Sequence, residues 1–388
     1  MREKLGLHCD VISGYAFSTS DWKDEGVPVV KIGNISNGED IICDEQIQYV
    51  NESFLDKLDE KYHITKGDVL ISLTGSHINQ PNSMVGRTCR SLTDRKYLLN
   101  QRAGKVLPFD NTNKNYLYYL LSTKAIKYDI ANRAYGGANQ VNVSPKDIKK
   151  IKWEFPDFST QKRIADILSA YDDLIENNNR RIALLEKAAQ ELYKEWFVRF
   201  RFPGYENAEF ENGIPKGWEY VKLGEYANIS TGKCNREDAE ENGIYPLFDR
   251  SQEVKRSSVW LKDCEAIIVP GEGTSFIPHY YKGKFNLHQR CYCVEPKISK
   301  TGKFIFYTLM LNRIYFLYVA TGATVPSLRQ NNFTNMKIIM PKMDLVIKYD
   351  DIVSSFIKEI NSLKERNDNL IKQRDLLLPR LMSGKLEV

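Results

Sequence analysis

The sequence predicts an α+β protein with two tandem repeated α/β domains, joined by two long antiparallel coiled-coil helices. Two observations predict this fold: segments of the first half recur in the second half in the same order, and each copy is followed by a long heptad pattern. We expect the domains at residues 1–158 and 205–342, and the coiled-coil segments at 159–204 and 343–388. At roughly 150 residues for a domain, the length fits two or three compact units.

Three pairs of matching segments indicate the duplication. Leu5-Gly6 matches Leu223-Gly224 at an offset of 218, Asn100-Gln101-Arg102 matches His288-Gln289-Arg290 at 188, and Gly137-Ala138 matches Gly322-Ala323 at 185. The offset falls by 30 (218 minus 188), so the first copy carries about 30 extra residues between Gly14 and Asn100. We therefore expect the two copies to differ most in this stretch.

Strands and helices alternate within each copy. Val27 to Ile32 and Asp68 to Leu73 are short runs rich in β-branched residues and bounded by turn formers, which is typical of strands. Tyr116 to Asn132 and Phe304 to Val319 have helical length and apolar periodicity. This mixture is the reason for the α+β assignment.

Each copy ends in a seam of residues spaced by alternating steps of four and three. The first seam is Ile164, Leu168, Tyr171, Ile175, Asn178, Ile182, Leu185, Ala189, Leu192 and Trp196; the second is Tyr349, Val353, Phe356, Ile360, Leu363, Asn367, Leu370, Arg374, Leu377 and Leu381. Such spacing predicts coiled-coil helices. The alternative is two amphipathic helices, each packed on its own domain. Pro379 should end or kink the second helix before Leu381.

An antiparallel pairing of the seams places apolar residues opposite apolar residues. In this register Tyr171 faces Arg374, whose guanidinium can stack on the ring, and Asn178 faces Asn367. Two amides that meet can satisfy each other and would fix register and orientation. The alternative is that each Asn lies at a solvated flank or faces a partner protein.

Composition and motifs exclude several functions. A net charge of +5 permits an anionic partner without indicating one. The five His and seven Cys lack metal-ligand spacing, so we expect reduced structural thiols and no metal site. The sequence contains no phosphate-binding G-x-x-x-x-G-K-[ST] loop, so we expect no cofactor on this chain. Neither a secretory leader nor a transmembrane run is present, and we expect a cytoplasmic protein.

Gly-rich polar patches recur in both copies and indicate DNA. Ser72 to His77 and Gly136 to Asn142 combine small residues with amides and hydroxyls, which reach phosphates and base edges, and Gly271 to Ser275 and Gly322 to Asn331 are their counterparts. Each patch alone would fit a plain turn, but a duplicated reader suits the two similar sites of a duplex. The candidate DNA-contacting residues are Ser72, Thr74, Ser76, Arg102, Asn139, Gln140, Asn142, Thr274, Ser275, His288, Arg290, Thr324 and Arg329.

Arg102 and Arg290 are alike in the two copies, so they cannot distinguish two different half-sites. We expect each to contact a phosphate or to brace the fold. Discrimination should come from the divergent stretches, Gly14 to Asn100 and Gly232 to His288.

The chain resembles the specificity subunits of type I restriction-modification systems over nearly its whole length. The residues that carry the resemblance are Trp196 to Gly204, Ile214 to Trp218, Gly14 to Phe17, Gly33 to Ile35 and Gln161 to Ala165. The resemblance implies a non-catalytic subunit whose two target-recognition domains each read half of a split double-stranded DNA site. It also implies two methyltransferase (modification) subunits and restriction subunits as partners, with S-adenosylmethionine, ATP and Mg on those partners.

Two other functions fit the sequence less well than DNA recognition. An enzyme that methylates or cuts DNA by itself needs a cofactor loop or an N-P-P-[FYW] base pocket, and the sequence has neither. A coiled-coil scaffold without nucleic acid would leave the duplicated patches unexplained.

Overall fold

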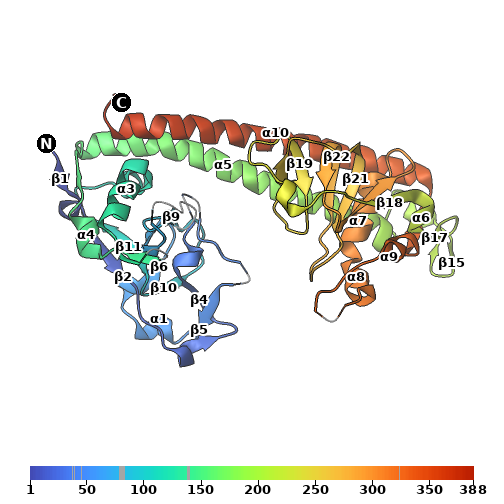
Figure 1. Ribbon diagram of the computed structural model, residues 1–388, viewed down its shortest axis with the longest axis horizontal. Helices are drawn as coiled ribbons and strands as arrows, with labels where there is room; N and C mark the ends of the chain where they lie inside the picture. Colours follow the sequence, from blue (N-terminus) through green and yellow to red (C-terminus); the bar gives the residue numbers. More distant parts are fainter. Residues whose placement is uncertain (37, 39, 45, 78–83, 138–139, 323) are drawn as a thin grey trace. The chain divides into compact units, whose positions relative to one another are not determined.

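The computed structural model of the protein describes residues 1–36, 38, 40–44, 46–77, 84–137, 140–322 and 324–388. The chain forms two compact units: unit 1 is Met1–Asn177 with Arg366–Val388, and unit 2 is Asn178–Glu365. Each unit therefore contains one repeat together with one end of each long helix (Figure 1). Among the described residues, no helix is both long enough and apolar enough to cross a membrane.

Unit 1 is a mixed α/β domain. Its strands are β1 Glu3–Lys4, β2 Cys9–Ser13, β3 Trp22–Lys23, β4 Val27–Val30, β5 Gln48–Val50, β6 His63–Ile64, β7 Val69–Ser72, β8 Thr74–Gly75, β9 Thr88–Arg90, β10 Tyr97–Leu99, β11 Ala103–Pro108, β12 Tyr135–Gly137, β13 Gln140–Asn142 and β14 Lys152–Trp153. Its helices are α1 Phe54–Lys57, α2 Lys114–Ser122, α3 Lys124–Arg133 and α4 Pro145–Lys149.

The core of unit 1 lies between a sheet and its covering helices. The four-stranded sheet β2-β11-β7-β9 shares a buried cluster with α2, α3 and α4, and a five-stranded sheet, β3-β5-β4-β10-β6, lies beside it. The strands expected from β-branched runs are present as β4 and β7, and all their residues are buried. Burial on both faces explains their continuous apolar sequences.

Unit 2 repeats this arrangement. Its strands are β15 Phe210–Glu211, β16 Ile214–Pro215, β17 Glu219–Lys222, β18 Ala227–Thr231, β19 Tyr245–Phe248, β20 Lys255–Ser257, β21 Lys262–Pro270, β22 His279–Leu287, β23 Cys291–Pro296 and β24 Lys337–Met340. Its helices are α6 Leu223–Tyr226, α7 Gly302–Leu311, α8 Arg313–Val319 and α9 Gln330–Thr334. Here the sheet is continuous, in the order β18-β23-β21-β22-β19-β20, because β21 pairs with β22 over seven residue pairs.

Strand registers confirm the duplication. The pair Ser72 and Ala103 in unit 1 has its equivalent in Pro270 and Cys291 of unit 2. Likewise Glu3 pairs with Trp153 as Val221 pairs with Ile338, and Val29 with Leu98 as Leu247 with Asn286. The last two matches keep the offsets of 218, 188 and 185 seen in the sequence; in the first, Ala103 and Cys291 keep 188, whereas Ser72 and Pro270 differ by 198 (270 minus 72).

The segments expected as single helices are each broken in two. Thr123 separates α2 from α3 because its backbone is extended, with ψ of 144°, and its hydroxyl accepts the Ile126 N–H as a new N-cap. In unit 2, Asn312 separates α7 from α8. The apolar periodicity continues across both breaks, so periodicity alone does not reveal them.

The two long helices are α5, Phe158–Tyr193, which continues as a π-helical turn over Lys194–Val198, and α10, Met343–Met382. The expectation that Pro379 ends the helix before Leu381 is wrong, since α10 continues to Met382. A proline removes only its own N–H from the helix, and the carbonyl of Pro379 still accepts from Ser383 at 3.2 Å.

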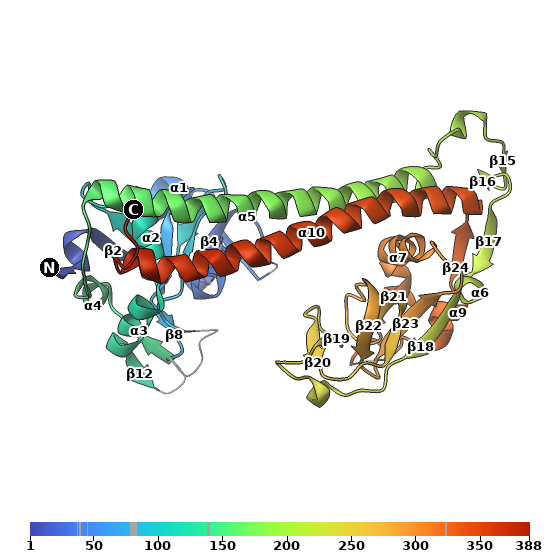
Figure 2. The ribbon, with the colours of Figure 1, turned by 90° about the horizontal axis from the view of Figure 1, so that it is seen from above.

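Within each unit, the ends of α5 and α10 lie side by side and antiparallel (Figure 2). In unit 1, Leu168 belongs to the same core cluster as Leu377 and Leu381. In unit 2, a smaller cluster joins Ile182 and Leu185 to Ile360 and Leu363. The heptad pattern and the antiparallel orientation are confirmed.

The polar positions of the seams behave differently from the apolar ones. The Arg374 guanidinium forms ion pairs, 2.7 Å from Asp172 and 2.9 Å from Asp375. Its stacking on Tyr171 stays a prediction. Asn178 and Asn367 are 8 % and 7 % exposed and belong to different units. Their pairing stays a prediction.

Candidate nucleic-acid interface

In unit 1, the two polar patches of the sequence come together in one small sheet. Strands β8, β13 and β12 form a three-stranded sheet in which Thr74 pairs with Asn142. The Thr74 hydroxyl donates to Asn142 Oδ1 at 2.7 Å. Gly136, at φ 145°, is required in the hairpin because a Cβ there would lie 2.5 Å from the Gln140 carbonyl oxygen.

Most hydroxyls of the first patch are buried. Ser72, Thr74 and Ser76 are at most 5 % exposed, and the Ser72 hydroxyl accepts the Arg87 N–H at 3.0 Å. Such side chains hold the patch together and do not present donors at its surface. Gln140 and Arg102 are exposed, Asn142 is half-buried, and Asn139 lies outside the described residues.

In unit 2, main-chain hydrogen bonds join the two equivalent patches. The Gly273 N–H donates to the Pro326 carbonyl at 3.0 Å, and the Leu328 N–H to the Gly271 carbonyl at 2.8 Å. Between them, Glu272 forms an antiparallel bridge with Ser327, in the place that Thr74 and Asn142 occupy in unit 1.

The other predicted residues of unit 2 lie around this junction. Thr274, Thr324 and Arg329 are exposed, whereas Ser275 is half-buried and its carbonyl accepts from Arg313 at 3.1 Å.

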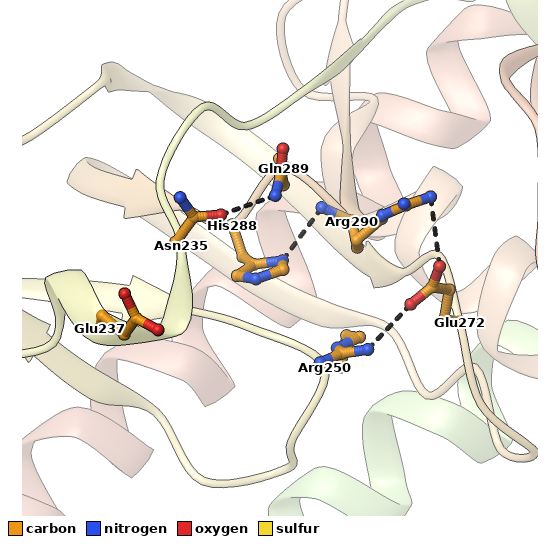
Figure 3. Close-up of a pocket in the computed structure, with 7 residues that line it drawn as sticks. All are labelled: Asn235, Glu237, Arg250, Glu272, His288, Gln289 and Arg290. Atoms are coloured by element: carbon orange, nitrogen blue, oxygen red, sulfur yellow. Dashed lines mark hydrogen bonds and ion pairs between the residues drawn. The ribbon is translucent and has the colours of Figure 1, made fainter.

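An open pocket of about 480 Å³ lies beside this junction (Figure 3). Its lining residues are Asn235, Glu237, Arg250, Glu272, His288, Gln289 and Arg290. The Gln289 amide donates to Asn235 Oδ1 at 2.6 Å. A smaller pocket, lined in part by Arg290 and Arg329, adjoins it.

Two arginines of the pocket share one carboxylate. Glu272 Oε2 lies 2.9 Å from Arg250, and Oε1 lies 3.2 Å from Arg290 (Figure 3). In unit 1, Arg102 is exposed, and among the residues that the structure describes its guanidinium has no ion-pair partner. Arg290 of the second copy is thus ion-paired with Glu272, whereas the equivalent Arg102 has no such partner among the described residues.

His288 braces the turn that carries Arg290. It is buried, and its Nδ1 accepts the Arg290 N–H at 3.0 Å, which requires that nitrogen to be deprotonated. Burial lowers the pKa of His288, and the neighbouring Arg250 cation lowers it further. The imidazole is therefore neutral at pH 7.

Sequence reasoning missed Asn235, Arg250, Glu272 and Gln289. Asn235 and Arg250 fall in the divergent stretch from Gly232 to His288, which was expected to carry discrimination, so their region was indicated but not their positions. Glu272 lies in the same stretch and in the Gly-rich patch Gly271 to Ser275, but its own position was not indicated, because its equivalent in the first copy is Thr74.

One group of possible metal ligands lies elsewhere in unit 2. Ligand atoms of Cys264, Cys293 and Glu295 lie within 4.8 Å of one another. Lys262 pairs with Glu295 at 2.9 Å, so the carboxylate already has a cation. The seven cysteines are free thiols, and burial raises the pKa of Cys9, Cys89 and Cys291 to about 12, which keeps those three protonated and inert.

The chemistry offered by these surfaces is hydrogen bonding and charge neutralisation. The pocket of unit 2 presents guanidinium and amide donors together with amide acceptors around a carboxylate. Guanidinium and amide groups in this arrangement suit phosphate oxygens and the polar edges of bases.

The family model described as "Type I restriction modification DNA specificity domain" matches residues 4–187 and 215–373. The chain is 29% identical over 317 residues to the type I restriction enzyme MjaIX specificity subunit of Methanocaldococcus jannaschii, covering 74% of this chain and 73% of the relative. It is 25% identical over 392 residues to the putative MjaX specificity subunit of the same organism, covering 94% and 88%.

Two further comparisons agree with these relatives. The type I restriction enzyme EcoDI specificity subunit of Escherichia coli is 30% identical over 177 residues, which cover 45% of this chain and 39% of the relative. Among solved structures, the S subunit of a type I restriction-modification system from M. genitalium has the same fold, with a TM-score of 0.59, 17% identity and coverage of 98% and 96%.

Proposed function

Because the chain belongs to the type I restriction-modification DNA specificity family, we propose that it reads a bipartite double-stranded DNA target, one half-site with each repeated domain. The observation that supports the proposal is the shared register of the two units. In each, two Gly-rich polar patches far apart in sequence meet beside the same turn, at Arg102 and at Arg290. Equivalent readers suit two half-sites along one duplex.

The chain is a recognition subunit and not the catalyst of its complex. We propose that it carries two methyltransferase subunits and that restriction subunits join for cleavage. S-adenosylmethionine, ATP and Mg then bind those partners, and this chain binds no cofactor. The assembled complex would be a DNA adenine methyltransferase and ATP-dependent endonuclease of the cytoplasm.

The helices account for a target with an unread spacer. The 40 residues of α10 span about 60 Å at 1.5 Å per residue. Half-sites one turn of DNA apart lie about 34 Å centre to centre, so helices of this length can separate two readers. Mapping methylated adenines in cells that carry the complete system should reveal two short half-sites. A single uninterrupted sequence would contradict the proposal.

Exchange of the divergent stretches tests which domain reads which half. Replacing residues 232–288 with the same stretch of a relative of different specificity should change one half-site and leave the other intact. The reciprocal exchange of residues 14–100 is the matched control and should change only the other half. A change in both half-sites after either exchange would contradict the assignment of one half-site to each domain.

An electrophoretic shift separates DNA recognition from a scaffold role. The full chain with its methyltransferase partner should shift target duplex in the presence of random-sequence competitor. A complex that assembles but never retains DNA would favour the scaffold.

A further inference from the structure

We propose that Glu272 is a positioning residue that determines specificity in the second domain. It holds Arg250 toward a guanine edge and Arg290 toward a phosphate of one half-site. The inference rests on the proposed function and assigns residues to it.

The position of the Glu272 carboxylate supports this positioning role. Glu272 is only 17 % exposed in its side chain, whereas Arg250 and Arg290 are 47 % and 56 % exposed. The carboxylate is thus more buried than the two guanidinium groups, and it lies between them and contacts each with a separate oxygen (Figure 3).

The backbone of Glu272 is held as firmly as its side chain. The preceding Gly271 donates to the Arg290 carbonyl at 2.7 Å and accepts from Leu328 at 2.8 Å. A Cβ on Gly271 would lie 2.6 Å from that Arg290 oxygen, so the close approach of the two turns requires glycine. The carboxylate therefore has a fixed position from which to orient the arginines.

Each arginine keeps donors for a ligand. A guanidinium carries five N–H donors in a planar fork; Glu272 accepts one N–H of Arg250 and forms an ion pair with Arg290. A fork that is already oriented loses less conformational entropy on binding than a free side chain. Glu272 also lowers the net charge of the pair, which weakens attraction to any phosphate backbone and leaves discrimination to geometry.

The loop that carries Arg250 is itself fixed. Asp249 is buried and accepts from the Ser251 N–H at 2.8 Å, and its other oxygen pairs with Lys255. Burial alone would raise the pKa of Asp249, but these contacts outweigh it and hold that pKa below its usual range. Arg250 therefore projects from a rigid turn toward Glu272.

The repeat separates the roles of the two arginines. Arg290 has an equivalent in Arg102, so it cannot distinguish two different half-sites and suits a phosphate. Arg250 corresponds to Ile32 at the offset of 218 that relates Val29 to Leu247, so it belongs to the second domain alone. Its planar fork matches the O6 and N7 acceptors of guanine in the major groove.

The test uses the full chain with its methyltransferase partner and duplexes that carry every single base change in each half-site. Arg250→Ala should reduce the preference for one G·C pair, in one half-site, by about tenfold to a hundredfold. Arg250→Lys keeps the charge without the planar fork, so it should retain affinity for random-sequence DNA and keep more of the base preference than Arg250→Ala, because a lysine can also donate to O6 and N7 of guanine. Retained preference in Arg250→Ala would overturn the base assignment in favour of a phosphate contact.

Glu272→Gln removes the charge and keeps the shape. It should lower the preference at that base pair and raise affinity for random-sequence DNA severalfold, a combination that mere loss of structure would not produce. Glu253→Gln is the matched control, since Glu253 is an exposed carboxylate on the loop of Arg250, and it should leave the preference unchanged. If both variants behave alike, or Glu272→Gln affects both half-sites equally, the inference fails. Wild-type protein without any sequence preference would instead overturn the proposed function.

Discussion

The first repeat contacts its helix ends through a charged cluster, and the second does so through aromatic rings. In unit 1, Asp172 of α5 lies 2.7 Å from Arg90 of β9 and 2.7 Å from Arg374 of α10, and it accepts the Tyr119 hydroxyl. In unit 2, the equivalent of Asp172 is Ile357 at the offset of 185.

Rings replace the charges in unit 2. Phe197, at the end of α5, has its ring centroid 5.0 Å from that of Phe304 and 5.2 Å from that of Tyr349. Its equivalent in unit 1 is Met382. Packing of the same fold on the same helix pair is therefore maintained by different chemistry, because the repeat preserves positions and burial more strictly than residue types.

The largest effect should come from removing one partner of the charged cluster. Asp172→Ala leaves the largely buried Arg90 without its carboxylate and Arg374 with Asp375 alone. Removal of one partner of a buried ion pair typically costs about 3–5 kcal/mol. We expect faster hydrogen exchange in β9, α2 and the C-terminal turns of α10, with unit 2 unaffected. Asp173→Ala, at the exposed neighbour, should cost less than about 0.5 kcal/mol.

A second variant tests the aromatic contacts of unit 2. Phe197→Ala should cost about 3–5 kcal/mol and accelerate exchange in α7 and the N-terminal turns of α10 only. Equal acceleration in both units, from either variant, would mean that the units do not unfold separately and that the comparison fails.

A smaller effect is expected from replacing the arginines of the two equivalent turns, Arg102 and Arg290. If both contact phosphate, Arg102→Ala and Arg290→Ala should each weaken binding to all sequences and reduce the salt slope by about one. Binding isotherms at several salt concentrations measure the slope. A changed base preference would contradict the phosphate assignment of that arginine.

The smallest expected effect is a pH dependence of folding stability. It arises from the first residue of each turn, which is His288 in unit 2 and Asn100 in unit 1. His288 Nδ1 accepts the Arg290 N–H at 3.0 Å, and Asn100 Oδ1 accepts the Arg102 N–H at 3.4 Å in unit 1. The pKa of His288 lies below its ordinary 6.5, chiefly because of burial. The unfolded chain therefore binds the proton more tightly, so stability is complete above pH 6.5 and falls as pH drops toward the folded pKa.

His288→Asn imports the residue of unit 1 and should remove this contribution. The stability advantage of the wild type over His288→Asn, measured by denaturant unfolding, should shrink between pH 7.5 and 5.5. His279, whose pKa is also lowered by burial, titrates in both proteins and cancels in the difference. An advantage that grows on acidification would show that the imidazolium is the stabilising form.

The duplication, the two heptad helices and their antiparallel pairing could all be predicted from the sequence. Each of these features follows from a pattern that is repeated over many residues. Single residues that do not fit the pattern therefore do not prevent its recognition. The seam positions Leu168 and Ile182 are buried as predicted, because a step of three or four on a helix defines a face without knowledge of its partner.

Which polar residues are exposed depends on the tertiary structure. Ser72, Thr74 and Ser76 are buried although the sequence around them is Gly-rich and polar. The presence of a serine or threonine in a sequence does not indicate which face of a sheet its hydroxyl will occupy. Arg250, Glu272 and Arg290 come from three separate loops whose meeting depends on strand register. Arg374 likewise forms an ion pair with Asp172, which the apolar spacing of the seams did not indicate. Contacts of this kind depend on packing in three dimensions, which a linear pattern does not contain.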